Sequence, residues 1–459
     1  MAKNYDAIVI GTGQAGPPLA ERLGQAGWKV AIIERQLFGG TCVNTGCIPT
    51  KTLVASAKVA NMVSRASEYG IEISGDVKID MKKVKARKDE ISGASNQGVE
   101  NWVKNMENVD TYEGHGKFKN NNTVKVNDEI LNAQNIFINV GGRANIPPIK
   151  GLDEVNFYTN SDMMGVDFIP KHLIVIGGSY IGLEFAQMYK RFGSEVTIVE
   201  MSDRLIGRED QDISENIKEI LQEEGINIRL SAECITVGKK GNEILVGVDC
   251  EKGDKEISGS HLLLATGRKP NTHDLGLENT DIEVDKRGYI KVDDKLETNV
   301  SGVWAIGDCN GKGAFTHTSY NDFEIVAANI LDSDTRKVTD RILCYGLFID
   351  PPLGRVGMSE NEVKKSGRKA LVGLRKMSRV GRAREKGETK GFMKDIVDAE
   401  SKEILGAAIL GVDGDEAIHC ILDVMYAKAP YTTIQRAVHI HPTVAELIPT
   451  VLGSLEPIN

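Results

Sequence analysis

Gly11-Thr12-Gly13-Gln14-Ala15-Gly16 is the stretch of sequence that decides the fold, because its three glycines separate an apolar run from a helical pattern. Residues 7–10 predict a buried strand, residues 18–27 a helix, and residues 28–33 a second strand that ends at Glu34. In a dinucleotide-binding turn, the first glycine permits the turn and the second lets backbone N–H groups reach a pyrophosphate, while the third packs helix against strand. The acidic residue then accepts hydrogen bonds from a ribose. The pattern therefore predicts a dinucleotide site.

A lone glycine motif also occurs in unrelated α/β folds, but this chain repeats the whole unit. Residues 173–176 predict a strand, Gly177-Gly178-Ser179-Tyr180-Ile181-Gly182 forms the turn, and a strand over residues 195–199 ends at Glu200. In both copies the acidic residue lies 23 positions after the first glycine. Ser179 replaces the middle glycine, which adds a Cβ where backbone should approach a phosphate, although its hydroxyl could also donate to one.

Two dinucleotide sites in one chain indicate a flavin together with a nicotinamide cofactor. Glu200 would repel a 2′-phosphate and accept a hydrogen bond from a free 2′-hydroxyl, so the sequence favours NADH over NADPH. Arg204, four residues later, leaves NADPH as the alternative.

Cys42 and Cys47 are the closest pair among seven scattered cysteines. They lie in the segment Gly39-Gly40-Thr41-Cys42-Val43-Asn44-Thr45-Gly46-Cys47-Ile48-Pro49-Thr50-Lys51. The glycines and the helical pattern after them place the thiols near a helix N-terminus, where the dipole lowers the pKa of a thiol. A zinc site would need further Cys or His ligands at close spacing, and two incidental buried cysteines are the other alternative. The segment favours a redox disulfide.

The charge balance and hydropathy exclude several classes of partner. Lys and Arg number 56 and Asp and Glu 65, for a net charge of −9, which gives no basic excess for nucleic acid. No apolar run approaches the roughly 20 residues that span a bilayer. The first residues enter an apolar strand without a signal-peptide pattern. We therefore expect a cytoplasmic protein with neither nucleic acid nor membrane as a partner.

The sequence resembles the pyridine nucleotide–disulfide oxidoreductases, which include dihydrolipoamide dehydrogenase, glutathione reductase and mercuric reductase. The resemblance covers essentially the whole chain and rests on the cysteine segment, both glycine motifs and three further stretches: Ala265-Thr266-Gly267-Arg268-x-Pro270-Asn271, Ala305-Ile306-Gly307-Asp308 and His441-Pro442-Thr443-x-x-Glu446. It implies an α/β fold with two Rossmann-like dinucleotide-binding domains, for FAD and NAD, and a C-terminal α+β dimerisation domain. The expected divisions are residues 1–149 for FAD and the redox disulfide, 150–271 for NAD(P)H, 272–336 for a returning FAD-binding central segment, and 337–459 for dimerisation.

The resemblance also implies roles for individual residues. Cys47 would be the thiolate next to the flavin and Cys42 the thiol that attacks the substrate. Lys51 would lie near the flavin and pair with Glu184.

His441, oriented by Glu446, would be the acid–base group for the thiols and would come from the partner subunit. A homodimer with a shared active site is thus implied. The implied cofactor-binding residues are Gly11, Gly13, Gly16, Glu34, Gly40, Thr41, Asp308, Gly177, Ser179, Gly182, Glu200 and Gly267; no metal ligand is implied.

The electron acceptor is the open question. Residues 42–53, 348–358 and 382–384 look more like the mercuric-reductase-like and reactive-chlorine-resistance branch than like dihydrolipoamide dehydrogenase. Mercuric reductases, however, carry a C-terminal cysteine pair and an N-terminal metal-binding domain, and no cysteine follows Cys420. The His441/Glu446 pair favours thiol–disulfide chemistry. We expect an NAD(P)H oxidoreductase that passes electrons to a small disulfide, oxidant or metal ion; dihydrolipoamide dehydrogenase and a low-turnover flavin redox sensor are the alternatives.

Overall fold

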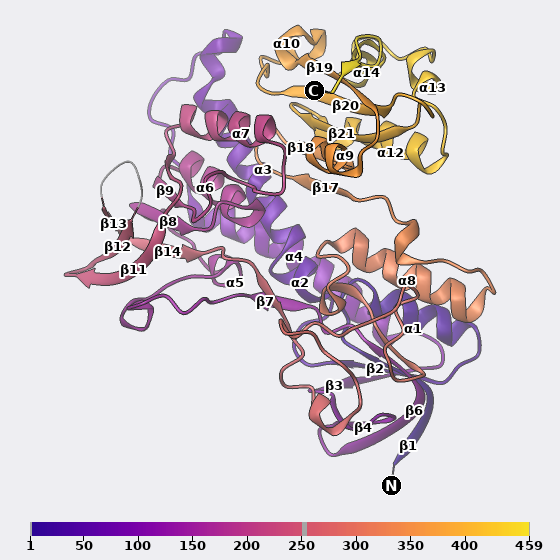
Figure 1. Ribbon diagram of the computed structural model, residues 1–459. Coiled ribbons are helices and arrows are strands. Elements are labelled where there is room, and N and C mark those ends of the chain that lie inside the picture. Colours follow the sequence, from indigo (N-terminus) through magenta and orange to yellow (C-terminus); the bar gives the residue numbers. More distant parts are fainter. Residues whose placement is uncertain (1, 250–254, 459) are drawn as a thin grey trace.

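The first sheet of the computed structural model, which describes residues 2–249 and 255–458, is built around the N-terminal glycine motif (Figure 1). Its strand order is β3-β2-β1-β6-β5-β4, and β16 (Val303–Ala305) also pairs with β6. Strands β1, β2, β3, β6 and β16 run parallel, whereas β4 and β5 are antiparallel additions. The elements of this part are β1 (Lys3–Ile10), α1 (Gly16–Gln25), β2 (Val30–Glu34), α2 (Gly40–Asn44), α3 (Cys47–Ser64), η1 (Ala66–Tyr69), α4 (Met81–Lys104), β3 (Val109–Glu113), β4 (Lys117–Asn120), β5 (Thr123–Val126), β6 (Glu129–Ile138) and β7 (Gly142–Ala144).

The central strands of this sheet are buried on both faces. Alternate residues of β1 enter two different cores: Ile8 and Ile10 one, Ala7 and Val9 the other. The second of these cores also contains Leu19 from α1. A parallel sheet covered on both faces requires such continuous apolar strands, which is why the runs before the glycine turns carry no polar residue.

The first helix and second strand differ slightly from their predicted bounds. Helix α1 begins at Gly16 rather than residue 18 and places two prolines in its first turn, where N–H groups have no helical partner. Strand β2 begins at Val30, because Gly27 has a φ of +86° and the Trp28 N–H donates back to the carbonyl of Leu23.

The second glycine motif builds a second parallel sheet, with the strand order β10-β9-β8-β14. A three-stranded antiparallel sheet, β11-β12-β13, lies beside it, and the short strands β7 and β15 pair with each other. The elements are η2 (Leu152–Glu154), α5 (Asn160–Met163), β8 (His172–Ile176), α6 (Tyr180–Phe192), β9 (Glu195–Val199), α7 (Gln211–Glu223), β10 (Asn227–Arg229), β11 (Glu233–Lys240), β12 (Glu243–Asp249), β13 (Glu256–Gly259), β14 (His261–Leu264) and β15 (Arg268–Pro270).

The chain then returns to the first sheet through β16, whose register places Ala305 beside Ile138. This return brings the residues after β16 to the carboxyl ends of the first sheet's parallel strands, where ligands bind in doubly wound folds. The elements of this segment are η3 (Leu277–Asn279), β16 (Val303–Ala305), η4 (Gly307–Asn310) and α8 (Thr316–Leu331).

The last part of the chain forms a six-stranded sheet in the order β17-β18-β21-β20-β19-β22, with antiparallel pairing throughout. Its elements are η5 (Val338–Asp340), β17 (Cys344–Leu347), β18 (Leu353–Gly357), α9 (Glu360–Ser366), β19 (Ala370–Lys376), η6 (Met377–Arg379), α10 (Gly381–Glu385), β20 (Phe392–Asp398), β21 (Ile404–Leu410), α11 (Gly414–Ala417), α12 (His419–Tyr426), α13 (Thr432–Gln435), η7 (Ala445–Leu447), α14 (Ile448–Val451) and β22 (Glu456–Pro457).

The C-terminal sheet packs firmly against the second parallel sheet. Leu353 and Leu410 belong to the same core as Leu173 and Val175. The ammonium of Lys394, which is only 2% exposed, lies 2.8 Å from Asp212 and 3.2 Å from Asp210 at the start of α7. Buried charges need such partners, so this pairing fixes how the two sheets meet.

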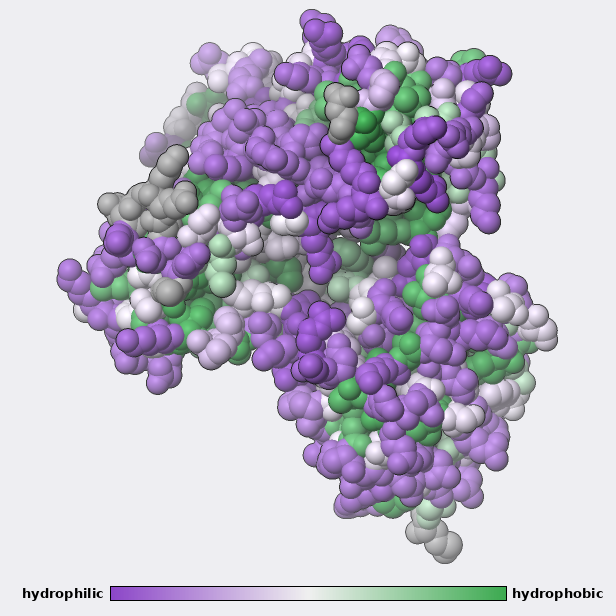
Figure 2. All heavy atoms as spheres, viewed as in Figure 1, coloured by the Kyte–Doolittle hydropathy of each residue, from purple (hydrophilic) through white to green (hydrophobic). Residues whose placement is uncertain are grey.

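The predicted fold class is confirmed: two Rossmann-like sheets are followed by a C-terminal α+β unit. The visible surface is mostly hydrophilic, with hydrophobic patches that include one at the C-terminal sheet (Figure 2). Among the described residues, no helix combines the length and apolar character that crossing a membrane requires.

Candidate active site

The two glycine turns have the same local geometry. Gly11 has a φ of +108°, and a Cβ on it would lie 2.4 Å from the carbonyl oxygen of Asn139. A Cβ on Gly16 would lie 2.1 Å from the carbonyl oxygen of Gly11, so this glycine allows helix α1 to pack against the strand end. Gly177 and Gly182 repeat these contacts. A Cβ on Gly177 would lie 2.4 Å from the carbonyl oxygen of Ala265, and a Cβ on Gly182 would lie 2.0 Å from the carbonyl oxygen of Gly177. At these glycine positions both turns exclude a side chain close to the N-terminus of a helix, an arrangement that suits an anionic pyrophosphate.

The acidic residues of the two copies also correspond. Glu34 accepts hydrogen bonds from the Thr12 N–H at 3.0 Å and the Gln36 N–H at 2.8 Å. Glu200 accepts from the Gly178 N–H at 2.6 Å and the Ser202 N–H at 2.8 Å. Each carboxylate thus lies at the mouth of its glycine turn, where it can accept from a ribose hydroxyl.

Gly178 must also stay small in the second turn. A Cβ on Gly178 would lie 2.6 Å from Leu205 and 3.0 Å from the Cβ of Glu200. Ser179 is exposed and is the N-cap residue of α6. The guanidinium of Arg204 donates to the carbonyl of Gly207 at 3.0 Å, within its own loop.

Gly40 joins the cysteine segment to the first glycine turn. It has a φ of +60°, and a Cβ on it would lie 3.0 Å from the Cα of Gly13. The Gly39 N–H donates to the carbonyl of Thr12 at 3.1 Å. The exposed Thr41 follows in α2, so the cysteine pair is held directly over the predicted dinucleotide turn.

Cys42 and Cys47 are free thiols that behave as one unit. Cys42 lies in the short helix α2, and Cys47 is the first residue of α3. Interaction with the Cys42 thiol lowers the pKa of Cys47 to about 6, with help from Thr316 and the charge of Lys51 and against the opposing effect of burial. The same interaction, together with burial, raises the pKa of Cys42. At neutral pH the pair therefore holds a thiolate at Cys47 and a thiol at Cys42.

Thr316 was not identified from the sequence, although its hydroxyl lies 3.0 Å from the Cys47 sulfur. It is the first residue of α8, so the N-termini of α3 and α8 meet at this sulfur. The two residues are 269 positions apart. No local pattern links them, and only the return of the chain to the first sheet brings them together.

Lys51 pairs with Glu184 as predicted. The lysine Nζ lies 2.7 Å and 2.9 Å from the two carboxylate oxygens, and the Phe348 N–H donates to one of them at 3.0 Å. Glu184 is nearly buried, and the ammonium also lies 4.5 Å from the centre of the Phe348 ring. This cluster joins α3, α6 and the C-terminal sheet one helical turn from Cys47.

Asp308 and Gly267 complete the predicted cofactor residues. Asp308 follows β16 in η4, 3.8 Å from the guanidinium of Arg268, and burial raises the pKa of its carboxyl group. Gly267 has a φ of +94° with open space beside it. The glycine turns and this aspartate lie at the carboxyl ends of parallel strands, an arrangement that suits dinucleotide binding.

His441 and Glu446 form a pair far from the cysteines in the chain. The imidazole Nδ1 lies 3.0 Å from both carboxylate oxygens, and the histidine side chain is 80% exposed. Among residues 2–249 and 255–458, no hydrogen bond or ion pair connects this histidine to either cysteine. The neighbouring Val438 and Ile440 are 100% and 80% exposed, which is unusual for apolar side chains and typical of a surface that another subunit covers.

Two family models match the chain. One, described as pyridine nucleotide-disulphide oxidoreductase, matches residues 5–322, and the dimerisation domain of the same family matches residues 344–452. The probable pyridine nucleotide-disulfide oxidoreductase RclA of Escherichia coli strain K12 is 36% identical, over 96% of this chain and 97% of that protein. Dihydrolipoyl dehydrogenase of Thermus scotoductus is 32% identical, with 97% and 96% covered.

Mercuric reductase of Bacillus cereus is also 32% identical, over 94% of this chain and 70% of that protein. The solved structure of the HOCl-induced flavoprotein disulfide reductase RclA from E. coli has a TM-score of 0.89 and 35% identity, and covers 98% of this chain and 99% of that one. Its Cu(II) complex matches equally well, with a TM-score of 0.89, 34% identity and the same coverage. The family depends on FAD and uses a pyridine nucleotide. On both the matched domains and these relatives, the chain belongs to the pyridine nucleotide-disulphide oxidoreductase family.

Proposed function

We propose that this chain takes electrons from NADH, passes them through FAD to a disulfide between Cys42 and Cys47, and delivers them to a small oxidant, disulfide or metal ion. The observation that carries the proposal is the position of Cys47 at the start of α3, 3.0 Å from the Thr316 hydroxyl and paired with Cys42. These contacts lower the pKa of Cys47 and favour the thiolate that a dithiol relay requires. When bound, FAD supplies hydride acceptance from the nicotinamide and electron transfer to the disulfide.

The two sulfurs would divide the work. Cys47, whose sulfur faces Thr316, would face the flavin, while Cys42 would attack the acceptor. Because the pKa of Cys42 is raised, its thiol needs a base before it can attack. We assign that role to His441 of the partner subunit, with Glu446 fixing the tautomer through the 3.0 Å contact to Nδ1.

Each turnover would move two electrons. NADH and one proton reduce the disulfide to two thiols. The dithiol then reduces one disulfide to two thiols, or two Cu(II) ions to Cu(I) with release of two protons, and the Cys42–Cys47 bond forms again.

Glu200 supports NADH as the preferred donor. Its carboxylate lies at the second glycine turn, hydrogen-bonded to the Gly178 N–H, where a ribose 2′-hydroxyl could replace or share that bond. A 2′-phosphate at the same place would meet the negative charge of the carboxylate. We further propose the division into residues 1–149 and 272–336 for FAD, 150–271 for the nicotinamide cofactor and 337–459 for the homodimer contact.

A thiophilic metal ion or an oxidant is the acceptor class that we favour. RclA of E. coli is described as HOCl-induced and has been solved as a Cu(II) complex. Dihydrolipoamide dehydrogenase activity is the second candidate function, because the His441–Glu446 pair suits thiol–disulfide exchange with a small disulfide.

The test is a screen of acceptors with NADH and the FAD-loaded enzyme: Cu(II), Hg(II), hypothiocyanite, glutathione disulfide and lipoamide. Wild type should turn over with at least one of them, and Cys42→Ser should lose that turnover while keeping its flavin. Turnover that Cys42→Ser retains in full would contradict the relay. NAD⁺-dependent oxidation of dihydrolipoamide at the fastest rate in the set would instead establish the second candidate.

A further inference from the structure

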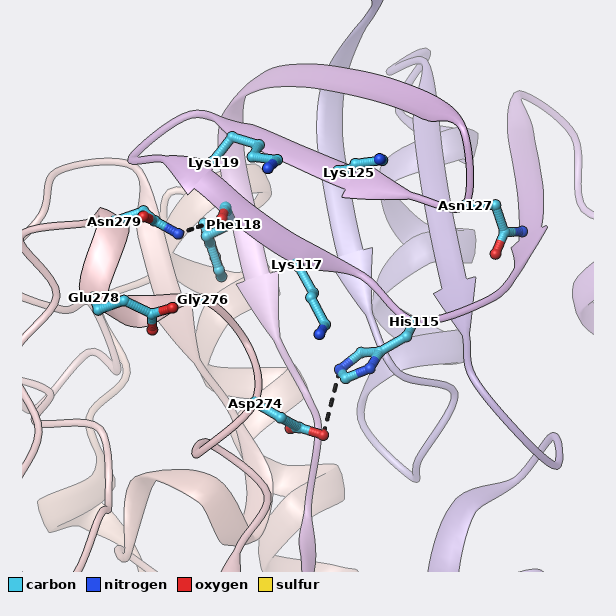
Figure 3. A pocket seen from close by; sticks show the side chains of 10 residues that line it. All are labelled: His115, Lys117, Phe118, Lys119, Lys125, Asn127, Asp274, Gly276, Glu278 and Asn279. Atoms are coloured by element: carbon cyan, nitrogen blue, oxygen red, sulfur yellow. Dashed lines mark hydrogen bonds and ion pairs between the residues drawn. The ribbon is translucent and has the colours of Figure 1, made fainter.

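A hollow of about 450 Å³ lies between the β4–β5 hairpin and the residues around η3, outside the proposed catalytic centre (Figure 3). Small-molecule sites commonly occupy about 300–1,000 Å³, so its size suits a compact metabolite. Nothing in the electron relay uses this hollow.

One wall of the hollow carries three lysines on the same face of the hairpin. Lys117 is directly opposite Lys125 in the antiparallel register, and Lys119 is two residues further along the same strand. Like charges opposite each other destabilise a strand pair. In Figure 3, Lys119 points toward Lys125, and Lys117 reaches down toward His115.

Within the described part of the chain, these lysines form no ion pair. Among the described residues, no carboxylate lies within 4.0 Å of the ammonium group of Lys117, Lys119 or Lys125, although the chain carries a net charge of −9. Three unpaired cations on one face of a hairpin, in an acidic protein, are the arrangement that an anion would stabilise.

The rest of the hollow is lined by His115, by the amides of Asn127 and Asn279, and by the carboxylates of Asp274 and Glu278. Asp274 pairs with Arg35 at 3.1 Å, and one of its oxygens lies 3.7 Å from the imidazole Nε2 of His115. In the part of the chain that the structure describes, that Nε2 and the second Asp274 oxygen are buried without a hydrogen-bond partner. Burial lowers the pKa of His115, so a neutral ring can donate to or accept from a hydroxyl.

We propose that this hollow binds a small organic phosphate, with the phosphate on the lysines and a hydroxyl of the ligand on His115 and Asp274. Arg35 directly follows Glu34, so the site adjoins the ribose end of the proposed FAD site without using its residues. The ligand and FAD would therefore bind together.

The experiment is calorimetric titration of the FAD-loaded enzyme, saturated with NAD⁺ so that the nicotinamide site is filled. Ribose 5-phosphate is the organic probe and inorganic phosphate the comparison. Wild type should bind both, ribose 5-phosphate more tightly, and both should weaken as salt rises.

A triple variant should bind ribose 5-phosphate about tenfold or more weakly, because charge-assisted hydrogen bonds are lost. It carries Lys117→Gln, Lys119→Gln and Lys125→Gln. The single variant Lys125→Gln should lower the affinity for ribose 5-phosphate about threefold. This variant tests the proposal even if the triple variant folds poorly. The matched control, Lys82→Gln/Lys365→Gln/Lys376→Gln, makes the same change in net charge at exposed sites and should bind like wild type. His115→Ala should remove the preference for ribose 5-phosphate over inorganic phosphate.

Three results would overturn the proposal: no binding to the FAD-loaded enzyme, equal loss in the control variant, or an increase in ribose 5-phosphate affinity when FAD is removed. The last would show that the hollow is part of the flavin site.

Discussion

The hydroxyl of Thr316 lies 3.0 Å from the sulfur of Cys47, at the point where helices α3 and α8 both begin. A thiolate there accepts a hydrogen bond from the hydroxyl and faces the positive ends of two helix dipoles. This arrangement stabilises the charged form of one cysteine of the pair.

Thr316→Val should therefore raise the pKa of Cys47 from about 6. A hydrogen bond to a charged group contributes about 1.5–3 kcal/mol, which corresponds to a rise of about 1–2 pH units. The measurement is the pH dependence of iodoacetamide alkylation of the reduced enzyme, and Cys42→Ser is the background that isolates Cys47. Because the Cys42 thiol is the largest cause of the low pKa of Cys47, Cys42→Ser itself is the reference for Cys42→Ser/Thr316→Val. In Thr316→Ser, which keeps the hydroxyl, the pKa of Cys47 should stay close to its value in the parent variant. Equal pKa values in the Val and Ser variants would contradict the account.

The cysteine segment and the glycine turns could be predicted from sequence because their chemistry is local. The turn geometry needs Gly11 and Gly16 at fixed spacing, and the chain shows that spacing twice. The contact of Thr316 with Cys47, and the cluster of lysines on the β4–β5 hairpin, could not be predicted from local sequence in the same way. Thr316 meets Cys47 only because β16 pairs with β6, and Lys117 meets Lys125 only through the hairpin register.

The role of Glu184 was partly predictable from the sequence. Its pairing with Lys51 across 133 residues was expected only because the whole chain resembled a family, not because of any pattern in α6. The burial of Glu184, and its acceptance of the Phe348 N–H, could not be expected from sequence at all. Ser179 occupies the N-cap position of α6 and is exposed, and its predicted contact with a phosphate stays a prediction.

Replacement of Glu200 should change the choice of nicotinamide cofactor. Glu200→Ala removes the charge that opposes a 2′-phosphate, so kcat/KM for NADPH should rise relative to that for NADH by about tenfold. Glu195→Ala, at the exposed first residue of β9, the strand that precedes Glu200, should leave the ratio unchanged. Steady-state kinetics with both cofactors provide the check, and an unchanged ratio in Glu200→Ala would place cofactor selection elsewhere.

A hybrid dimer should reveal whether His441 acts on the other subunit. Cys42→Ser and His441→Gln homodimers should each lose most acceptor reduction. A hybrid with one subunit of each kind would contain one complete site, formed by Cys42 of the His441→Gln chain and His441 of the other. With two different affinity tags to isolate it, this hybrid should recover about half of wild-type activity, since one of two sites is intact. If both residues served the same chain, the hybrid would be as inactive as its parents.

Asp395 should make stability depend on pH. It is fully buried on β20, both of its oxygens lack a hydrogen-bond partner among the described residues, and burial raises its pKa to about 7. Because the folded state holds the proton more tightly than the unfolded state, stability falls as pH rises from about 4 to 7.

Asp395→Asn should therefore stabilise the protein at pH 8, by on the order of 4 kcal/mol, and by less than half as much at pH 5. Urea unfolding of the FAD-loaded enzyme at the two pH values measures this difference. Asp423→Asn on α12, which is exposed, serves as the matched control and should show no such pH dependence. A stability gain that is the same at both pH values would mean that Asp395 does not titrate in this range.

The central claim is that electrons reach the Cys42–Cys47 pair through FAD, and anaerobic reduction with NADH tests it most directly. In wild type, a Cys47 thiolate beside oxidised flavin should produce a long-wavelength absorbance band after one equivalent of NADH. Cys42→Ser should show that band even before NADH is added, because its Cys47 is already free, whereas Cys47→Ser should never show it. A band that persists in Cys47→Ser, or wild-type flavin that bleaches with no band at all, would contradict the account.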